Sequence, residues 1–216
     1  MCTRVQIPAS MASVPRPRGF TETDILERAM QYFWTNGYES SSMAALTTHL
    51  GLHPGSLYRT FTDKHTLFLR ALAHYRDTQT RQLTPKLLAG GPVLPRIREV
   101  LIDYLEAAAN EAVPRGCIAV NTVGERLPRD EAASQIVQEI LALVEDGFRQ
   151  GLTAAAQRGE IPADTDVDTE ATMLMTLLQG LQVVVKAERN PRRLTQMVDA
   201  MLMRLAGQPP VRPASA

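Results

Sequence analysis

Residues 41–64, SSMAALTTHLGLHPGSLYRTFTDK, decide the fold that this sequence predicts. Ser41 is a good N-cap for a first helix, because its hydroxyl can accept a hydrogen bond from a backbone N–H group of the first turn. Gly51 lies where that helix must stop, and Pro54 fits the first turn of a second helix, where its missing N–H has no intrahelical partner. Thr62 can cap the helix that follows. The stretch therefore predicts two short helices joined by a tight turn, with a third helix directly behind them, which is a helix-turn-helix pattern.

The second of these helices is too short and too polar to be buried on all sides. A helix of this kind fits the major groove of DNA, with its early residues at the base edges. Arg59 is the best candidate for a bidentate contact to guanine, and a surface salt bridge is the alternative. Tyr58 and Lys64 are expected to hold phosphates, as is Ser41 or Ser42 at a helix N-terminus. The residues expected at the DNA are Ser41, Ser42, His53, Gly55, Ser56, Tyr58, Arg59, Thr60 and Lys64.

The run from residue 37 to residue 67, GYESSSMAALTTHLGLHPGSLYRTFTDKHTL, resembles the DNA-binding domain of the TetR family of bacterial transcriptional regulators. The match covers residues 20–68 and is strongest at Gly51, residues 55–58, Phe61, Lys64 and Leu67. His53 stands where a capping Ser is common and His65 where Glu is common, which bears on base preference and not on the fold. The resemblance implies an all-helical homodimer that represses transcription until a small molecule binds its C-terminal domain.

The composition carries no strong bias. The 216 residues are 44% hydrophobic and 21% charged, with a formal net charge of zero, so no global basic field marks a nucleic-acid partner. Local patches matter more than totals, so this is weak evidence against DNA binding. The two cysteines, Cys2 and Cys117, suit a reducing cytosol. No apolar run is long enough to span a membrane, and the N-terminus lacks the apolar core of a signal peptide.

Neither a cofactor nor a metal site is expected. His49 and His53 are four residues apart, which is a metal-ligand spacing on a continuous helix. Gly51 interrupts the helix between them, and no nearby cysteine or carboxylate completes a site.

The chain divides into four segments. Residues 1–19, whose charged side chains are Arg4, Arg16 and Arg18, predict a disordered arm that is either a solvated tail or adds DNA contacts. Residues 20–66 form the expected DNA-binding domain, residues 67–207 a C-terminal helical regulatory and dimerisation domain, and residues 208–216 a disordered tail. A helix over 63–82 links the domains, Pro85 to Pro95 predict a break, and amphipathic helices follow at 95–111, 116–126, 131–158, 166–188 and 191–206. The predicted fold class is therefore all-α.

Residues 115–125, RGCIAVNTVGE, are the second informative stretch. Cys117, Asn121 and Glu125 are spaced by four and so share one helical face. A thiol near a helix start, beside Arg115, is expected to have a lowered pKa and a larger thiolate fraction. The run resembles a TetR-family subgroup with a G-C-x-x-x-N-x-x-x-E segment, some members of which sense electrophiles or oxidants through this cysteine. The alternative is a buried cysteine that packs and does not react.

Lys186 belongs to a mostly apolar predicted helix. If it is buried near Cys117, its ammonium group stabilises the thiolate; the alternative is a lysine at a helix end whose head reaches water. A reversible inducer would instead occupy an apolar pocket near Tyr104, Cys117, Asn121 and Met173.

The helices at 166–188 and 191–206 are apolar on more than one side, which predicts the four-helix interface of a homodimer; a thick monomer core is the alternative. The family resemblance implies that such a dimer binds a pseudo-palindromic operator. The sequence thus favours a cytoplasmic repressor released by a small molecule of unknown identity or by modification of Cys117, with the linking helix as the lever. The open alternatives are a repressor with a reversible apolar inducer and a structural Cys117, a DNA-binding scaffold or activator, and a helical thiol-dependent enzyme. An enzyme is least favoured, because no histidine beyond the linking helix can act as a base.

Overall fold

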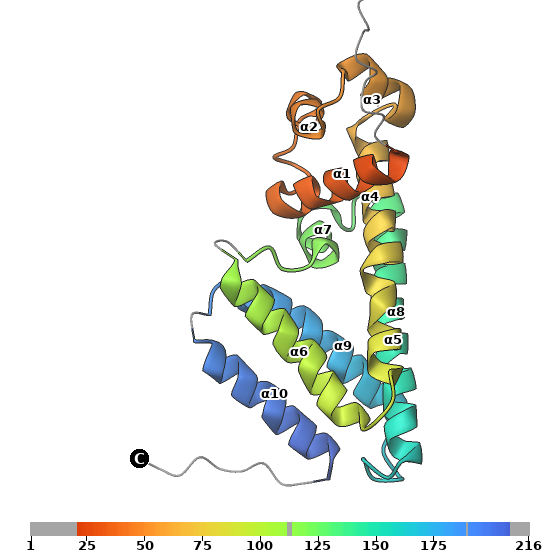
Figure 1. Ribbon diagram of the computed structural model, residues 1–216, viewed down its shortest axis with the longest axis vertical. Coiled ribbons are helices and arrows are strands. Elements are labelled where there is room, and N and C mark those ends of the chain that lie inside the picture. Colours follow the sequence, from red (N-terminus) through yellow and green to blue (C-terminus); the bar gives the residue numbers. More distant parts are fainter. Residues whose placement is uncertain (1–20, 112–113, 189, 208–216) are drawn as a thin grey trace, which may run out of the picture.

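The computed structural model describes residues 21–111, 114–188 and 190–207, and every regular element in these residues is a helix. The predictions made for the arm at 1–19 and the tail at 208–216 lie outside the described residues. None of the described helices is long and apolar enough to cross a membrane. The elements are α1 (Glu22–Asn36), α2 (Met43–Leu50), α3 (Pro54–Phe61), α4 (Lys64–Thr78), the 3₁₀ turn η1 (Thr80–Gln82), α5 (Leu83–Leu88), α6 (Val93–Asn110), α7 (Ile118–Arg126), α8 (Glu131–Gln157), α9 (Val167–Val184) and α10 (Pro191–Leu205) (Figure 1).

Helix α2 begins one residue later than the sequence suggested. Its N-cap is Ser42, whose hydroxyl oxygen accepts a hydrogen bond from the backbone N–H of Ala45 at 3.1 Å. Ser41 is buried instead and donates its hydroxyl to the carbonyl oxygen of Gly37, so the expected cap at Ser41 is wrong. Gly51 ends the helix in the left-handed conformation, with a φ of 66°, as predicted.

Helix α4 is capped by Asp63 and not by Thr62. Asp63 accepts the backbone N–H of Thr66 at 2.7 Å, whereas Thr62 ends α3 with a φ of 56°. A carboxylate at this position accepts a hydrogen bond from a free N–H group, and its negative charge interacts favourably with the positive end of the helix dipole.

The predicted break after the linking helix contains a helix of its own, α5. Pro85 and Pro95 lie in the first turns of α5 and α6, where a missing N–H group costs no intrahelical hydrogen bond. The actual interruption is at Gly90 and Gly91, which have φ values of 100° and 70°. Helix α9 ends at Val184, earlier than expected, so Lys186 lies beyond the helix.

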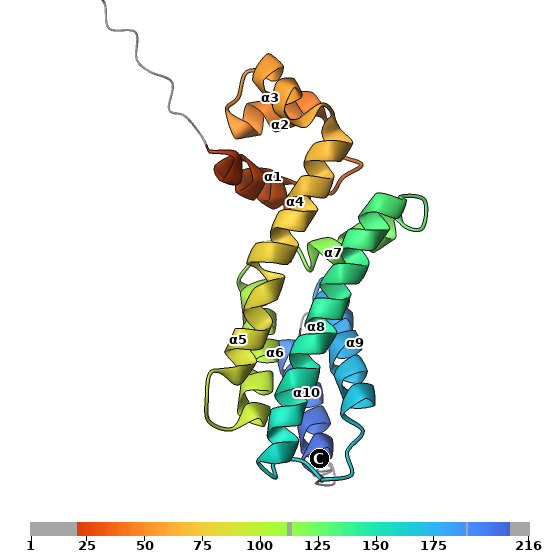
Figure 2. The same ribbon diagram turned by 90° about the vertical axis from the view of Figure 1, so that its right-hand side faces the viewer.

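Two hydrophobic clusters organise the molecule. The first cluster contains residues of α1, α2, α3, α4, α7 and the first half of α8. The second contains residues of α5, α6, the second half of α8, α9 and α10. Helix α8 runs along both clusters beside α4 (Figure 2). The core beneath the helix-turn-helix unit therefore includes residues from far along the chain.

Candidate nucleic-acid interface

Helix α3 buries an apolar face and presents a polar one to solvent. Leu57 and Phe61 are completely buried, whereas Tyr58 is 49% exposed and Arg59 and Thr60 are exposed beside it. Within the described residues, the Arg59 guanidinium has no ion pair or hydrogen bond, so the salt-bridge alternative finds no partner there. The exposed face is thus free to contact a ligand, and the apolar face fixes its orientation.

His53 caps α3 in an unusual way. It is the N-cap residue, and its Nδ1 atom accepts the backbone N–H of Gly55 at 3.3 Å. An accepting Nδ1 carries no proton, so the neutral ring holds its proton on Nε2, which can donate to a phosphate. Ser56 is half-buried in the first turn of the same helix. The imidazole of His53 therefore caps α3 at a position where a serine is common.

Two residues expected at DNA phosphates are held inside the domain. The side chain of Ser41 is bonded to Gly37 in a residue that is 3% exposed, so the predicted phosphate contact by Ser41 is wrong, and Ser42 is the exposed residue at that helix end. Lys64 Nζ donates to the carbonyl oxygens of Tyr38 at 3.0 Å and Ser41 at 2.9 Å. Lys64 thus fixes the turn between α1 and α2, and its phosphate contact stays a prediction.

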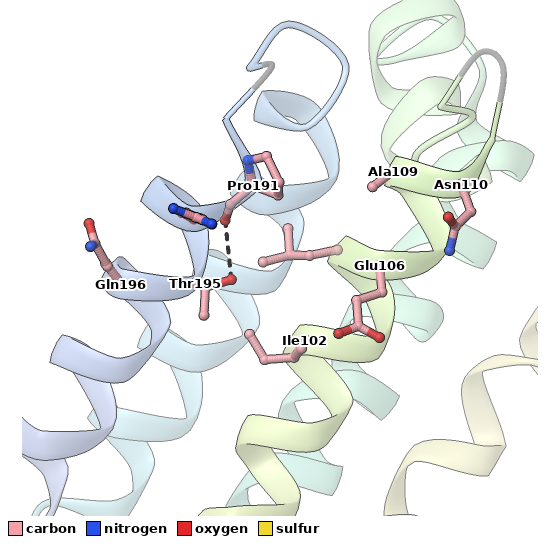
Figure 3. Close-up of a pocket in the computed structure, with 9 residues that line it drawn as sticks. Ile102, Glu106, Ala109, Asn110, Pro191, Thr195 and Gln196 are labelled. Carbon is pink, nitrogen blue, oxygen red and sulfur yellow. Dashed lines mark hydrogen bonds between the residues drawn. The ribbon is translucent and has the colours of Figure 1, made fainter.

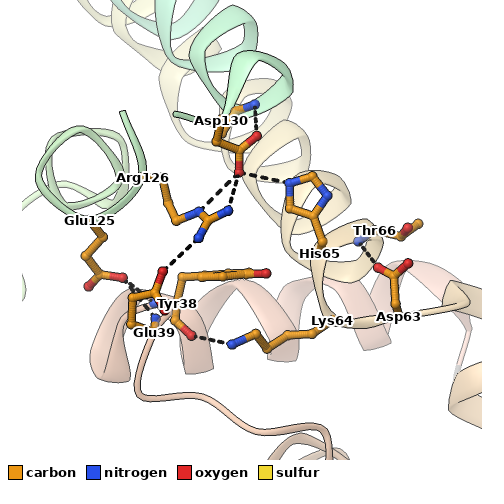
Figure 4. A network of polar contacts seen from close by, with 10 residues as sticks. Tyr38, Glu39, Asp63, Lys64, His65, Thr66, Glu125, Arg126 and Asp130 are labelled. Atoms are coloured by element: carbon orange, nitrogen blue, oxygen red, sulfur yellow. Dashed lines mark hydrogen bonds and ion pairs between the residues drawn. The ribbon is translucent and has the colours of Figure 1, made fainter. Parts of the chain in front are cut away.

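Helices α4, α7 and α8 meet this turn in a polar network (Figure 4). Arg126, at the end of α7, donates to Glu39 at 2.7 Å and to Asp130 at 3.1 Å, and its guanidinium carbon lies 4.4 Å from the centre of the Tyr38 ring. His65 Nε2 lies 2.9 Å from the same Asp130 oxygen. Burial opposes ionisation of Asp130, but hydrogen bonds from the first turn of α8, His65 and Arg126 outweigh it and hold the pKa of Asp130 below its ordinary value.

Cys117 is the N-cap residue of α7 and is only 3% exposed. Its sulfur lies 3.6 Å from the hydroxyl oxygen of Tyr75 on α4. Burial raises the pKa of the Cys117 thiol, although the N–H groups of α7, Tyr75 and Lys186 act in the opposite direction. The expected lowering of this pKa is therefore wrong, because desolvation outweighs the helix start. Arg115 does not help the thiolate, since it pairs with Glu111 at 2.8 Å.

The other residues of the predicted sensor face connect α7 to its surroundings. Lys186 is exposed, and its Nζ donates to Asn121 Oδ1 at 2.6 Å. Asn121 in turn donates to the carbonyl oxygen of Arg115 at 3.0 Å. Glu125 is exposed and accepts hydrogen bonds from the turn that leads into α2. The helical face predicted from the spacing therefore runs from the buried Cys117 to the surface.

Asn121 and Met173 line different hollows of the surface, so the single apolar pocket expected near Tyr104, Cys117, Asn121 and Met173 stays a prediction. Tyr104 has a buried hydroxyl with no hydrogen-bond partner in the described residues, and burial, with Cys117 nearby, raises its pKa. Met173 lines a hollow of about 420 Å³ on the surface of α9 and α10. A separate hollow of about 500 Å³ lies between α6 and α10 (Figure 3); its lining includes Ile102, Glu106, Ala109, Pro191 and Thr195.

Several contacts between segments far apart in the chain were not predicted from the sequence. Asp130 directly precedes a strongly periodic helix, which is a recognisable N-cap pattern. The indole N–H of Trp34 donates to the carbonyl oxygen of Gly116 at 2.8 Å, and Tyr75 packs on Trp34 edge to face. No pattern in the sequence pairs residues so far apart along the chain.

A solvent-facing helix in a helix-turn-helix unit, attached to a C-terminal helical bundle, defines a DNA-binding regulator. Residues 25–71 match the family model described as bacterial regulatory proteins, tetR family, and residues 93–201 match the Tetracyclin repressor-like, C-terminal domain. The HTH-type transcriptional regulator YezE of Bacillus subtilis (strain 168) is 30% identical over 87% of this chain and 97% of its own length. The HTH-type transcriptional repressor ComR of Escherichia coli (strain K12) is 29% identical over 87% of this chain and 90% of its own.

Solved structures give the same result. A cysteine mutant of the TetR family transcriptional regulator CifR, complexed with 26-bp operator DNA, is 33% identical, covers 87% of this chain and 98% of its own, and has a TM-score of 0.75. Reduced NemR of E. coli, at 18% identity over 88% of this chain and 97% of its own, has a TM-score of 0.73, a likeness of fold alone. The chain belongs to the TetR family of bacterial transcriptional regulators. It is accordingly a regulator and not a thiol-dependent enzyme.

Proposed function

We propose that this protein is a cytoplasmic repressor that binds a pseudo-palindromic operator as a homodimer through residues 20–66 and is released by a small molecule. The exposed face of α3, with Tyr58, Arg59 and Thr60 beside the buried Leu57 and Phe61, carries the proposal. Such a face presents hydrogen-bonding groups to base edges while the helix stays anchored in its core. The operator complex of the related CifR supports this assignment.

Arg59→Ala is expected to change base preference, because a bidentate arginine contact discriminates guanine by about 1–3 kcal/mol. Duplexes selected from a random-sequence library by the wild-type and variant proteins should give different sequence logos. Lys64→Ala serves as the comparison, since loss of a cation that supports the domain is expected to weaken all sequences alike. Identical logos for wild type and Arg59→Ala would contradict base readout by Arg59.

The proposed dimer interface lies on α9 and α10. Exposed Met173 and Met197 line the hollow between these helices, together with Thr172, Thr176, Leu177 and Met201. Met173→Glu is expected to shift the protein toward monomer in sedimentation measurements, because the added carboxylate must lose its water in an apolar interface. Arg204, which lies beside Met173 and already pairs with Glu170, offsets this cost only in part. Ala163→Glu, which adds the same charge on an exposed loop, is the control. A monomeric wild-type protein across the micromolar range would contradict the dimer.

Of the two modes of sensing, the reversible one is better supported. The thiol of Cys117 is buried and its pKa is raised, so the thiolate that would attack an electrophile is scarce. We therefore propose that Cys117 is structural and that the inducer binds reversibly in the C-terminal domain.

Native Cys117 is expected to react with iodoacetamide on the order of 10-fold or more slowly than the same cysteine in urea, because it is buried and protonated. Cys2→Ser removes the second thiol from the measurement. DNA binding is titrated before and after the reagent, with Cys117→Ser alongside. Loss of DNA affinity in the treated Cys2→Ser protein, but not in the Cys2→Ser/Cys117→Ser protein, would establish a cysteine switch and overturn the reversible mode.

A further inference from the structure

A single carboxylate on α7 holds the turn that leads into the helix-turn-helix pair. Glu125 Oε2 accepts the backbone N–H groups of Tyr38 at 2.7 Å and Glu39 at 3.2 Å. These donors lie between α1 and α2, and they belong to residues 86 and 87 positions away from Glu125. Hydrogen bonds to an ionised acceptor are the stronger ones in proteins. The turn therefore depends on a side chain outside the helix-turn-helix sequence.

Gly37 makes this close approach possible. It ends α1 with a φ of 76° and a ψ of 171°, a conformation that is almost restricted to glycine. A Cβ atom built on Gly37 would overlap Glu125 Oε1. The backbone thus leaves room for the carboxylate at the point where a side chain would exclude it.

Arg126, next to Glu125, and Lys64 on α4 also bind the turn between α1 and α2. Arg126 bonds Glu39, and Lys64 on α4 bonds the carbonyl oxygens of Tyr38 and Ser41 (Figure 4). The centre of the Tyr38 ring lies 4.0 Å from Lys64 Nζ and 4.4 Å from the guanidinium carbon of Arg126. The turn is therefore gripped by α4 and α7 together, and α4 is not the sole connection to the C-terminal half.

Helix α7 also reaches the end of α9. Its residue Asn121 accepts the Lys186 ammonium at 2.6 Å, and a Cβ on Gly116, just before the helix, would lie 2.8 Å from the Gln182 carbonyl oxygen. Helix α7 is thus in contact with the last turn of α9 at one end and with the α1–α2 turn at the other. These contacts link the end of α9, through α7, to the backbone beside α2.

We infer that Glu125 is a positioning residue for DNA binding, which acts by holding the α1–α2 turn in the orientation that the recognition unit requires. This inference rests on the proposed DNA-binding function and gives α7 a role in transmission beside the linking helix. Glu125 touches no DNA in this scheme. Its removal therefore weakens affinity through the geometry of the turn and leaves the phosphate contacts in place.

The sign of the effect separates this role from that of an ordinary exposed acid. Neutralising a surface glutamate makes the protein more positive, which leaves DNA affinity unchanged or raises it. Glu125→Gln is expected instead to lower affinity about 3- to 10-fold, because the neutral amide oxygen binds the two N–H groups less strongly. Glu131→Gln is the matched control, since Glu131 is exposed on α8 and has no ion pair or hydrogen-bonding side-chain partner in the described chain.

The probe is a duplex that the wild-type protein selects from a random-sequence library, titrated at several salt concentrations. Glu125→Gln should lower affinity with an unchanged salt slope, since no phosphate contact is lost. Amide hydrogen exchange should become faster over residues 34–42 and stay unchanged in α6. Equal affinities of Glu125→Gln and Glu131→Gln, or unchanged exchange over residues 34–42, would overturn the inference. If the wild-type protein selects no duplex, the proposed function fails, and the exchange measurement still decides whether Glu125 holds the turn.

Discussion

Phe61→Ala is expected to cost the protein about 3–5 kcal/mol of its free energy of unfolding, and most of its DNA binding with it. Phe61 is completely buried at the end of α3, in the cluster that also contains Leu57, Leu67 and Phe68. Removal of the ring leaves a cavity that the neighbouring helices fill only partly. The loss is a large fraction of the 5–15 kcal/mol that holds a typical domain together.

Urea unfolding checks this expectation through the fluorescence of Trp34, the only tryptophan of the chain, which packs against the same cluster. Tyr58→Ala is the matched control on the same helix. The side chain of Tyr58 is 49% exposed. The free energy of unfolding of the Tyr58→Ala protein should therefore differ from that of wild type by less than about 0.5 kcal/mol, while its DNA affinity falls. Equal urea midpoints for Phe61→Ala and wild type would show that the ring does not support the domain.

Gly116→Ala is expected to destabilise the contact between the start of α7 and the end of α9. Gly116 has a φ of 69°, which costs an alanine about 1–2 kcal/mol. The added Cβ would lie 2.6 Å from Lys186 Cε and 2.8 Å from the carbonyl oxygen of Gln182. The lysine side chain can move away, but the backbone carbonyl cannot move without shifting the end of α9. The total cost should therefore exceed the backbone strain alone.

Gly124→Ala, in the helix that follows Gly116, provides a control of opposite sign. Gly124 lies inside α7, and a Cβ there would meet no atom within 4 Å. An alanine at this position is expected to add about 0.5–1 kcal/mol of stability, because it restricts the unfolded chain and favours the helix. Thermal unfolding of both variants tests the pair. A Gly116→Ala protein as stable as wild type would mean that α7 and α9 pack less closely than the contacts indicate.

The sequence could predict whatever depends on local pattern. Cap residues, Gly51 and Pro54 in residues 41–64 placed α2 and α3, and the polar side chains of α3 indicated that one of its faces is exposed. Cap positions were right only to within one residue at Ser42 and Asp63, because adjacent serine, threonine and aspartate residues compete for the same role. The prolines misled where they fell in first turns, since a proline there begins a helix as readily as it ends one.

What the sequence by itself determined is the all-helical fold and the polar, solvent-exposed face of α3, because helical periodicity and cap chemistry act over a few residues. The resemblance of residues 20–68 added the family. The tertiary structure alone decided that Cys117 is buried against Tyr75, with a raised pKa, and that Glu125 grips the backbone at Tyr38. Desolvation and long-range hydrogen bonds depend on which distant helices meet. Helical spacing gives the face on which a residue lies, and only the packed structure shows what that face meets.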